Sequence, residues 1–147
     1  MQLAMGEYYT LTMMPAADIK SFIRLARLYD IADKSTLARS YFSKALNINK
    51  NNADLNFYLG EFYYKRHEYH HALYHYKIAY NSGYAGQYNL NLKLGIIYEK
   101  LADLINAQKY YQISYLLNPQ NKELQQKIHS IYELNYDKTD YYHIIRE

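Results

Sequence analysis

The sequence has no cysteine and no tryptophan, and only 5 glycines and 2 prolines among its 147 residues. Without cysteine the chain cannot form a disulfide framework, a thiolate metal site or a cysteine nucleophile. No P-loop, dinucleotide fingerprint, G-x-S-x-G turn or H-E-x-x-H motif is present. The sequence therefore offers no candidate catalytic residues, and we expect no cofactor.

Long apolar runs are also missing, since none approaches the ~18 residues that a membrane-spanning helix needs. The first residues carry no basic side chain and no apolar core segment, so they do not resemble a secretory signal. These absences predict a chain without a membrane partner and make the cytoplasm the expected compartment.

The charge is only mildly basic, with 17 Lys and Arg against 14 Asp and Glu and a net charge of +3. Basic and acidic residues alternate along the chain without forming a Lys/Arg block, which argues against nucleic acid as a partner. The unusual feature of the composition is its 21 tyrosines. They predict either a base-stacking surface or a repeated structural position.

An internal repeat supports the second explanation. The stretch Leu59-Gly60-Glu61-Phe62-Tyr63 resembles Leu94-Gly95-Ile96-Ile97-Tyr98. In both copies an alanine follows the glycine after 12 residues, and a tyrosine follows that alanine after 4. A third copy upstream has the same spacing, with Ala26, Ala38 and Phe42. Apolar residues at helical spacing accompany these positions and predict pairs of amphipathic helices.

This pattern resembles the tetratricopeptide repeat, a helix-turn-helix unit of about 34 residues. The resemblance implies an all-α, right-handed superhelix of three helix-turn-helix repeats with a C-terminal capping helix. We number each repeat from its first residue, so that Gly60 and Gly95 occupy position 8. The predicted boundaries are an N-terminal cap or half-repeat at 1–18, repeats at 19–52, 53–87 and 88–121, and a capping helix with a tail at 122–147.

Two segments outside the repeat pattern carry further expectations. The junction Asn81–Gln87 contains two glycines and one extra residue, and we expect it to be the softest joint of the array. The capping helix is expected to begin at Lys122 and to break at Asn135–Asp140. Residues Tyr141–Ile145 then form either a last short helix or a tail.

The resemblance also implies a binding surface, because the first helices of successive repeats line a concave groove in this family. Carried over to this sequence, the groove residues are Arg27, Phe57, Tyr58, Glu61, Tyr64, Lys65, Leu92, Lys93, Ile96 and Lys100. Such a groove suits a peptide segment with apolar anchors and some acidic residues. Packing of Phe57 and Leu92 against neighbouring helices is the alternative.

The implied function is a non-enzymatic interaction module, acting as a chaperone or an assembly scaffold for a protein or peptide partner. The alternatives are a homo-oligomer whose groove is filled by its own terminus or, less favoured, a protein that binds single-stranded nucleic acid or metal. The family's carboxylate clamp, which needs Lys, Asn and Arg at set positions, retains only Lys93 here. Partners of that class are therefore disfavoured.

One histidine cluster, at residues 67–75, is the only metal-like arrangement. His71 and His75 are spaced i, i+4 and could share one metal ion. A third ligand is missing, and both positions are expected on the outer, solvated face of a helix. We therefore expect no metal site.

Overall fold

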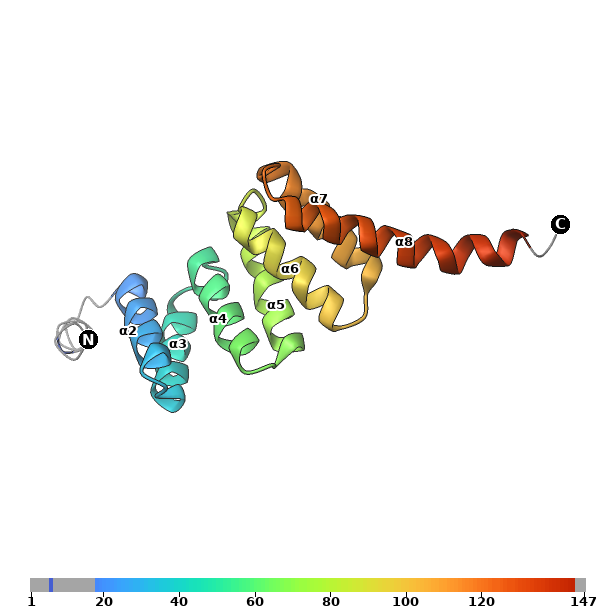
Figure 1. The fold of residues 1–147 in the computed structure, drawn as a ribbon. Coiled ribbons are helices and arrows are strands. Elements are labelled where there is room, and N and C mark those ends of the chain that lie inside the picture. Colours follow the sequence, from blue (N-terminus) through green and yellow to red (C-terminus); the bar gives the residue numbers. More distant parts are fainter. Residues whose placement is uncertain (1–5, 7–17, 145–147) are drawn as a thin grey trace. The chain divides into compact units, whose positions relative to one another are not determined.

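The computed structural model describes residue 6 and residues 18–144, with side chains up to residue 134. Its described part is all-α, as the sequence predicts (Figure 1). The helices are α2 (Ile19–Ile31), α3 (Ser35–Ile48), α4 (Ala53–Lys65), α5 (Tyr69–Ala79), α6 (Tyr88–Lys100), α7 (Leu104–Leu117) and α8 (Lys122–Ile144), with a short π-turn η1 (Tyr80–Tyr84) after α5. The predicted N-terminal cap or half-repeat lies outside the described residues, apart from Gly6 and Asp18.

The helices are paired as helix-turn-helix units, α2 with α3, α4 with α5, and α6 with α7. The first helices of the pairs begin at Ile19, Ala53 and Tyr88, where the sequence numbering places position 1. The chain forms two compact units, residues 1–83 and 84–147, and each is described by itself. The right-handed superhelix stays a prediction, because it concerns the arrangement of these units.

Close contact inside each of the last two pairs depends on glycine at position 8. A β-carbon added at Gly60 would lie 2.4 Å from the ring of Tyr76, and one added at Gly95 would lie 2.5 Å from the ring of Tyr111. Both rings are fully buried. Real β-carbons do not approach other atoms this closely, so in these two pairs a larger residue at position 8 requires the tyrosine ring or the helices to move.

A second repeated contact joins position 11 of the first helix to position 23 of the second. The rings of Tyr29 and Tyr41 stack with centroids 5.4 Å apart, and those of Tyr98 and Tyr110 stack at 5.5 Å. In the middle repeat Tyr63 stacks at 5.4 Å on the imidazole of His75. Much of the tyrosine content is therefore architectural.

The turn between the two helices of each pair is also repeated. Position 15 has a positive φ in every copy, 56° at Asp33, 58° at His67 and 60° at Ala102. This left-handed conformation is unusual for residues other than glycine. The three turns therefore share one backbone conformation at position 15, although the residue there differs in each repeat.

Two buried asparagines hold the entry to α4 and α6. The side chain of Asn56 donates to the carbonyl oxygens of Lys50 and Asn52 at 2.8 and 2.9 Å. Asn91 donates in the same way to Ala85 and Gln87 at 2.7 and 2.9 Å. Both occupy position 4, where the family usually has an aromatic residue. Each amide thus ties the first turn of its helix to the preceding loop.

The expected break in the C-terminal helix at Asn135–Asp140 is wrong, because α8 continues to Ile144. No proline or glycine lies between Lys122 and Ile144. The Asn, Asp and Thr residues of this stretch cost only about 0.7 kcal/mol each at most relative to alanine. That composition weakens a helix without ending it.

The base of α8 is attached to its own unit by apolar and polar contacts. Leu124 and Ile131 are buried, and the ammonium of Lys127 lies 3.0 Å from the Glu99 carboxylate. Tyr132 occupies position 11 of the capping helix, as Tyr29, Tyr63 and Tyr98 do in the repeats, yet it is 44% exposed. In the three repeats the tyrosine at position 11 stacks on a ring of the second helix.

The junction that the sequence marks contains the boundary between the two units, at Gly83 and Tyr84. After α5 the backbone makes the π-turn η1, in which Ser82 and Gly83 leave helical geometry. Gly83 has a φ of 118°, which a side chain would strain. The extra residue of this junction is therefore accommodated by a wide turn in which Gly83 takes the positive φ.

Candidate peptide-binding groove

The first unit contains a surface pocket of about 180 Å³ between α2 and α4. It is lined by Arg27, Asp30, Ile31, Phe42, Phe57, Tyr58, Glu61 and Lys65. Five of the predicted groove residues are among them. Phe42 from α3 closes the base, whereas Ile31 is 62% exposed at the rim.

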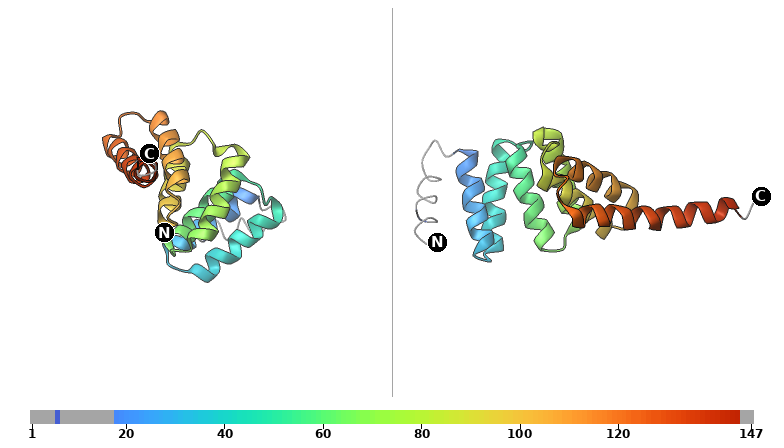
Figure 2. Two further views of the ribbon diagram at one scale, coloured as in Figure 1. Left: turned by 90° about the vertical axis from the view of Figure 1, so that its right-hand side faces the viewer. Right: turned by 45° about the horizontal axis from the view of Figure 1, so that its top comes forward.

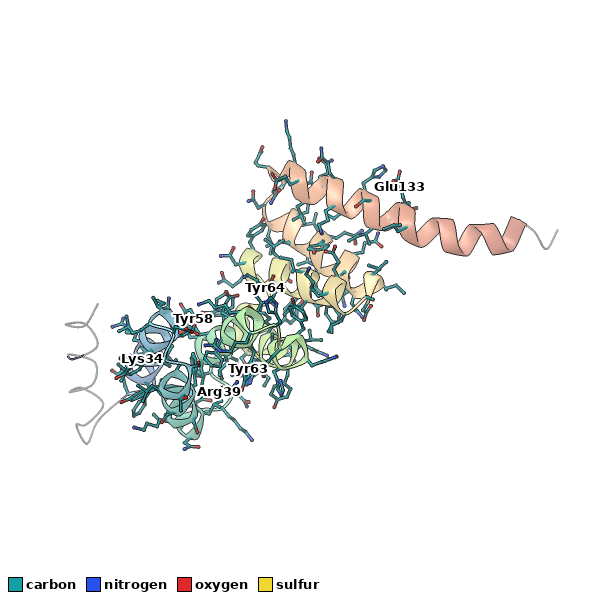
Figure 3. The ribbon with its side chains drawn as sticks, turned by 60° about the horizontal axis from the view of Figure 1, so that its bottom comes forward. Lys34, Arg39, Tyr58, Tyr63, Tyr64 and Glu133 are labelled. Carbon is teal, nitrogen blue, oxygen red and sulfur yellow. The ribbon has the colours of Figure 1, made fainter. Side chains whose placement is uncertain are left out.

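Aromatic rings form one wall of this pocket. Phe57 and Tyr58 meet edge to face with centroids 5.5 Å apart, and Phe57 also lies 5.9 Å from the buried ring of Tyr76. The guanidinium of Arg27 lies 3.9 Å above the centroid of the Tyr58 ring, a cation–π contact that links α2 to α4. Figure 3 labels Tyr58 on this part of the unit. Both partners are favoured residue types at binding hot spots.

The charges beside this wall are arranged around Asp30. Its carboxylate accepts hydrogen bonds from Lys65 at 2.7 Å and from Arg66 at 2.9 Å. The Asp30 side chain is only 9% exposed, whereas that of Lys65 is 53% exposed. Arg66 also donates to the carbonyl of Phe62 and lies 3.6 Å over the Phe62 ring. Two cations therefore share one carboxylate, which leaves the local charge positive.

The second carboxylate of the pocket, Glu61, is engaged by the protein itself. It accepts a hydrogen bond from the hydroxyl of Tyr76. Burial, and then the negative charge of Glu61, raise the pKa of the Tyr76 hydroxyl well above its usual range, so this group stays a donor. Glu61 thus links the pocket to the core.

The remaining predicted groove residues lie elsewhere. Tyr64 is half-buried and meets Tyr69 with ring centroids 6.0 Å apart, and it does not line the pocket. Leu92, Lys93 and Ile96 are half-buried on α6 of the second unit, where Lys100 is exposed. That these four residues extend the groove stays a prediction.

Comparison with known structures identifies the fold. The solved structure of YrrB, described as a TPR protein with an unusual peptide-binding site, superposes with a TM-score of 0.77 over 84% of this chain at 21% identity. The fold is that of tetratricopeptide-repeat proteins. MamA matches with a TM-score of 0.77 over 90% of this chain and 77% of its own, at 17% identity.

A third tetratricopeptide-repeat structure is the first repeat domain of Spaghetti (RPAP3), bound to the HSP90 peptide SRMEEVD. It matches with a TM-score of 0.69 over 82% of this chain and 95% of its own, at 16% identity. The present chain spans 63% of the length of YrrB. No protein-family model and no curated protein matches the sequence.

Within this tetratricopeptide-repeat fold, the histidine cluster differs from the prediction. His71 is exposed and pairs with Glu68 at 3.4 Å, but His75 is half-buried and does not lie on a solvated face. Its Nδ1 lies 2.9 Å from Oδ1 of Asn56. Among residues 18–134, no three His, Cys, Asp or Glu side chains are grouped to hold a metal ion.

The role of His75 follows from a comparison with the tyrosines at the same repeat position. Tyr41 and Tyr110 occupy position 23 in the other repeats, and His75 keeps their ring stack while adding a donor. Both hydrogens of the Asn56 amide are already donated, so Nδ1 of His75 carries the proton and donates to Oδ1. Burial, and then the nearby His71, lower the pKa of His75 to about 4. The imidazole is therefore neutral at pH 7.

Sequence reasoning missed this pair. The recurrence of asparagine at position 4 in two repeats was the available signal, although by itself it is only a departure from the family pattern.

No membrane-spanning candidate is found among the described helices, since none combines the length and the apolar composition that a span needs.

Proposed function

We propose that this chain is a non-enzymatic interaction module that binds a peptide segment of a partner protein against the α2–α4 face. The observation that carries the proposal is the pocket of about 180 Å³ with an aromatic wall and exposed cations at its rim. Pockets for small molecules usually measure ~300–1,000 Å³. The smaller volume suits one apolar side chain of a longer ligand.

The charges indicate what flanks that side chain. Arg27 and Lys65 are exposed, whereas Asp30 and Glu61 already accept hydrogen bonds from the protein. An acidic residue next to the apolar anchor would meet these cations without facing a free carboxylate. The ligand class is therefore an extended or helical segment with an apolar anchor and acidic neighbours, and the role is that of a chaperone or an assembly scaffold. Leu92, Lys93, Ile96 and Lys100 would extend the surface for such a segment.

The test uses the fluorescently labelled peptides EELEE, KKLKK and EEGEE, titrated by anisotropy against the whole chain. EELEE is expected to bind most tightly, because only this peptide carries both the anchor and the acidic flanks. Ile31→Glu should weaken its binding at least about tenfold, since it places a carboxylate at the pocket rim. Ile48→Glu is the matched control, because Ile48 is 51% exposed on α3 and does not line the pocket.

The double variant Tyr58→Ala with Lys93→Glu tests whether the second unit contributes. It should weaken EELEE binding more than Tyr58→Ala alone while helicity is preserved. Equal binding of EELEE and KKLKK, or an equal effect of the Ile31 and Ile48 variants, would show that this face is not the binding site.

A further inference from the structure

The second unit exposes an uncharged stripe of α7 that has a large apolar side chain at each end. On α7, residues 105, 108, 112 and 116 are spaced three and four apart and share one helix face. Ile105 and Leu116, at the two ends of this stripe, are each 77% exposed. Gln108 and Gln112 lie between them.

In the preceding repeats the residues at the two ends of this stripe, positions 18 and 29, are polar, and Leu73 is the one apolar residue among the eight that correspond to it. Positions 18, 21, 25 and 29 are Thr36, Arg39, Ser43 and Asn47 on α3, and they are His70, Leu73, Lys77 and Asn81 at and beyond α5. Arg39 places a positive charge at position 21 and Lys77 places one at position 25. On α7 these two positions carry the neutral amides of Gln108 and Gln112. The repeat architecture therefore does not explain the stripe on α7.

The stripe borders a larger hollow shared with α8. A cavity of about 440 Å³ is lined by Gln108, Gln112, Gln125, Gln126, Ile128, His129 and Tyr132. The two helices lie side by side (Figure 2), and buried Leu124 and Ile131 attach α8 to its unit. Residues 125, 128 and 132 occupy the neighbouring side of α8. We call the stripe and this cavity lining together the α7–α8 face.

The chemistry of this face is neutral and self-complementary. His129 and Tyr132 are the only ionisable side chains that line the cavity, and a tyrosine hydroxyl is neutral at pH 7. Each glutamine amide both donates and accepts, so it can pair with another amide like itself. The neighbouring charged residues have opposite signs, Lys109 on α7 and Glu133 on α8, the latter labelled in Figure 3. The carboxylate of Glu133 lies 3.2 Å from Nε2 of His129.

We propose that the α7–α8 face binds the same face of a second copy of this chain. A two-fold interface presents one patch to itself, so residues of like charge are excluded and neutral amides with apolar ends are favoured. The helix α7 is ~21 Å long at ~1.5 Å per residue. A face of this size is at the low end of stable interfaces, so the dimer is expected to be reversible.

Sedimentation equilibrium of the whole chain, from roughly 10 to 500 µM, measures this association in the concentration range of a small interface. The average mass should rise from 17.6 kDa towards twice that value. The variant Ile105→Glu/Leu116→Glu should remain monomeric throughout, because each copy then brings two carboxylates to the contact. Both residues are largely exposed, so the helical circular-dichroism signal should be unchanged.

The matched control is Thr36→Glu/Asn47→Glu, which makes the same charge change at the same two positions on α3. It should associate like the parent chain. A monomeric parent at the highest concentration, or equal loss of association in both variants, would overturn the proposal. So would a dimer that Tyr58→Ala dissociates and Ile105→Glu/Leu116→Glu does not, because that pattern indicates association through the α2–α4 groove.

A second experiment does not depend on the glutamate variant folding. Because the chain has no cysteine, Gln112→Cys introduces a single thiol at the middle of the stripe. Mild oxidation should convert most of this variant to a disulfide-linked dimer. Ser43→Cys places a thiol at the same position of α3 and should cross-link much more slowly, and equal rates for the two thiols would contradict the proposed contact.

Discussion

Replacement of His75 by phenylalanine tests the hydrogen bond that distinguishes the middle repeat. Phenylalanine can keep the ring stack on Tyr63 but has no donor for Oδ1 of Asn56, which lies 2.9 Å from Nδ1 of His75. Asn56 is fully buried, so its oxygen would lose this partner without gaining water. Such a loss costs about 1–3 kcal/mol of unfolding free energy.

The third repeat supplies the matched control, Tyr110→Phe. Tyr110 occupies the position of His75 and stacks on Tyr98, but Oδ1 of Asn91 has no hydrogen-bond partner. Removal of the Tyr110 hydroxyl therefore breaks no bond to the asparagine. We expect this variant to lose less than about 1 kcal/mol.

The pH dependence gives a second, independent readout. The unfolded histidine takes up a proton near pH 6.5, whereas burial and then His71 lower the pKa of folded His75 to about 4. The unfolded state thus binds more protons between these values, and stability falls as the pH decreases from 6.5 to 4. The full shift, 6.5 − 4 = 2.5, corresponds to at most about 3.4 kcal/mol. Because the imidazole is only half-buried, solvent screening reduces this to ~1–2 kcal/mol.

Urea unfolding followed by circular dichroism at several pH values between 7 and 4 measures both quantities. The His75→Phe variant should be less stable than the parent at pH 7, and the difference should shrink as the pH falls. Other titrating groups are present in both proteins and cancel in the difference. Parallel stability curves for parent and variant would refute the assigned role of His75.

Three further predictions concern other features. Gly60→Ala should destabilise the protein by about 1–3 kcal/mol in thermal unfolding, because the new methyl group overlaps the Tyr76 ring, whereas Gly86→Ala meets no atom within 4 Å and should change little. Asp30→Asn should cost about 1–3 kcal/mol in urea unfolding, since it leaves two cations without their carboxylate. Asp137→Pro should remove the helical circular-dichroism signal of the end of α8, and an unchanged signal would contradict a continuous helix.

Sequence spacing could predict the helix pairs because each repeat needs a small residue at the same position. Gly60 and Gly95 mark position 8, where the structure shows that a tyrosine ring leaves no room for a β-carbon. An expected break at Asn135–Asp140 was wrong for a physical reason. Residue propensities of a few tenths of a kcal/mol do not end a helix that has no proline or glycine.

The groove was less predictable, because side-chain partners determine what a position offers to a ligand. The family pattern predicts Lys65 and Glu61 as charged residues of the groove. In the structure Lys65 is hydrogen-bonded to Asp30, and Glu61 is hydrogen-bonded to Tyr76. The spacing of His71 and His75 was typical of a shared metal. It did not reveal that His75 faces Asn56, since that contact spans two helices and depends on how they pack.

The left-handed residue at position 15 has a consequence for how this array can be modified. Three different residues, Asp33, His67 and Ala102, adopt the same backbone conformation there, and none of them is a glycine. Alanine gains nothing from its side chain at such a site and carries a strain of about 1–2 kcal/mol. Glycine at residue 102 would remove that strain, although its greater freedom in the unfolded chain offsets part of the gain. Residue 102 is thus a position between α6 and α7, outside both helices, where a single substitution can change the stability of the second unit without changing a residue of the α2–α4 groove or of the α7–α8 face.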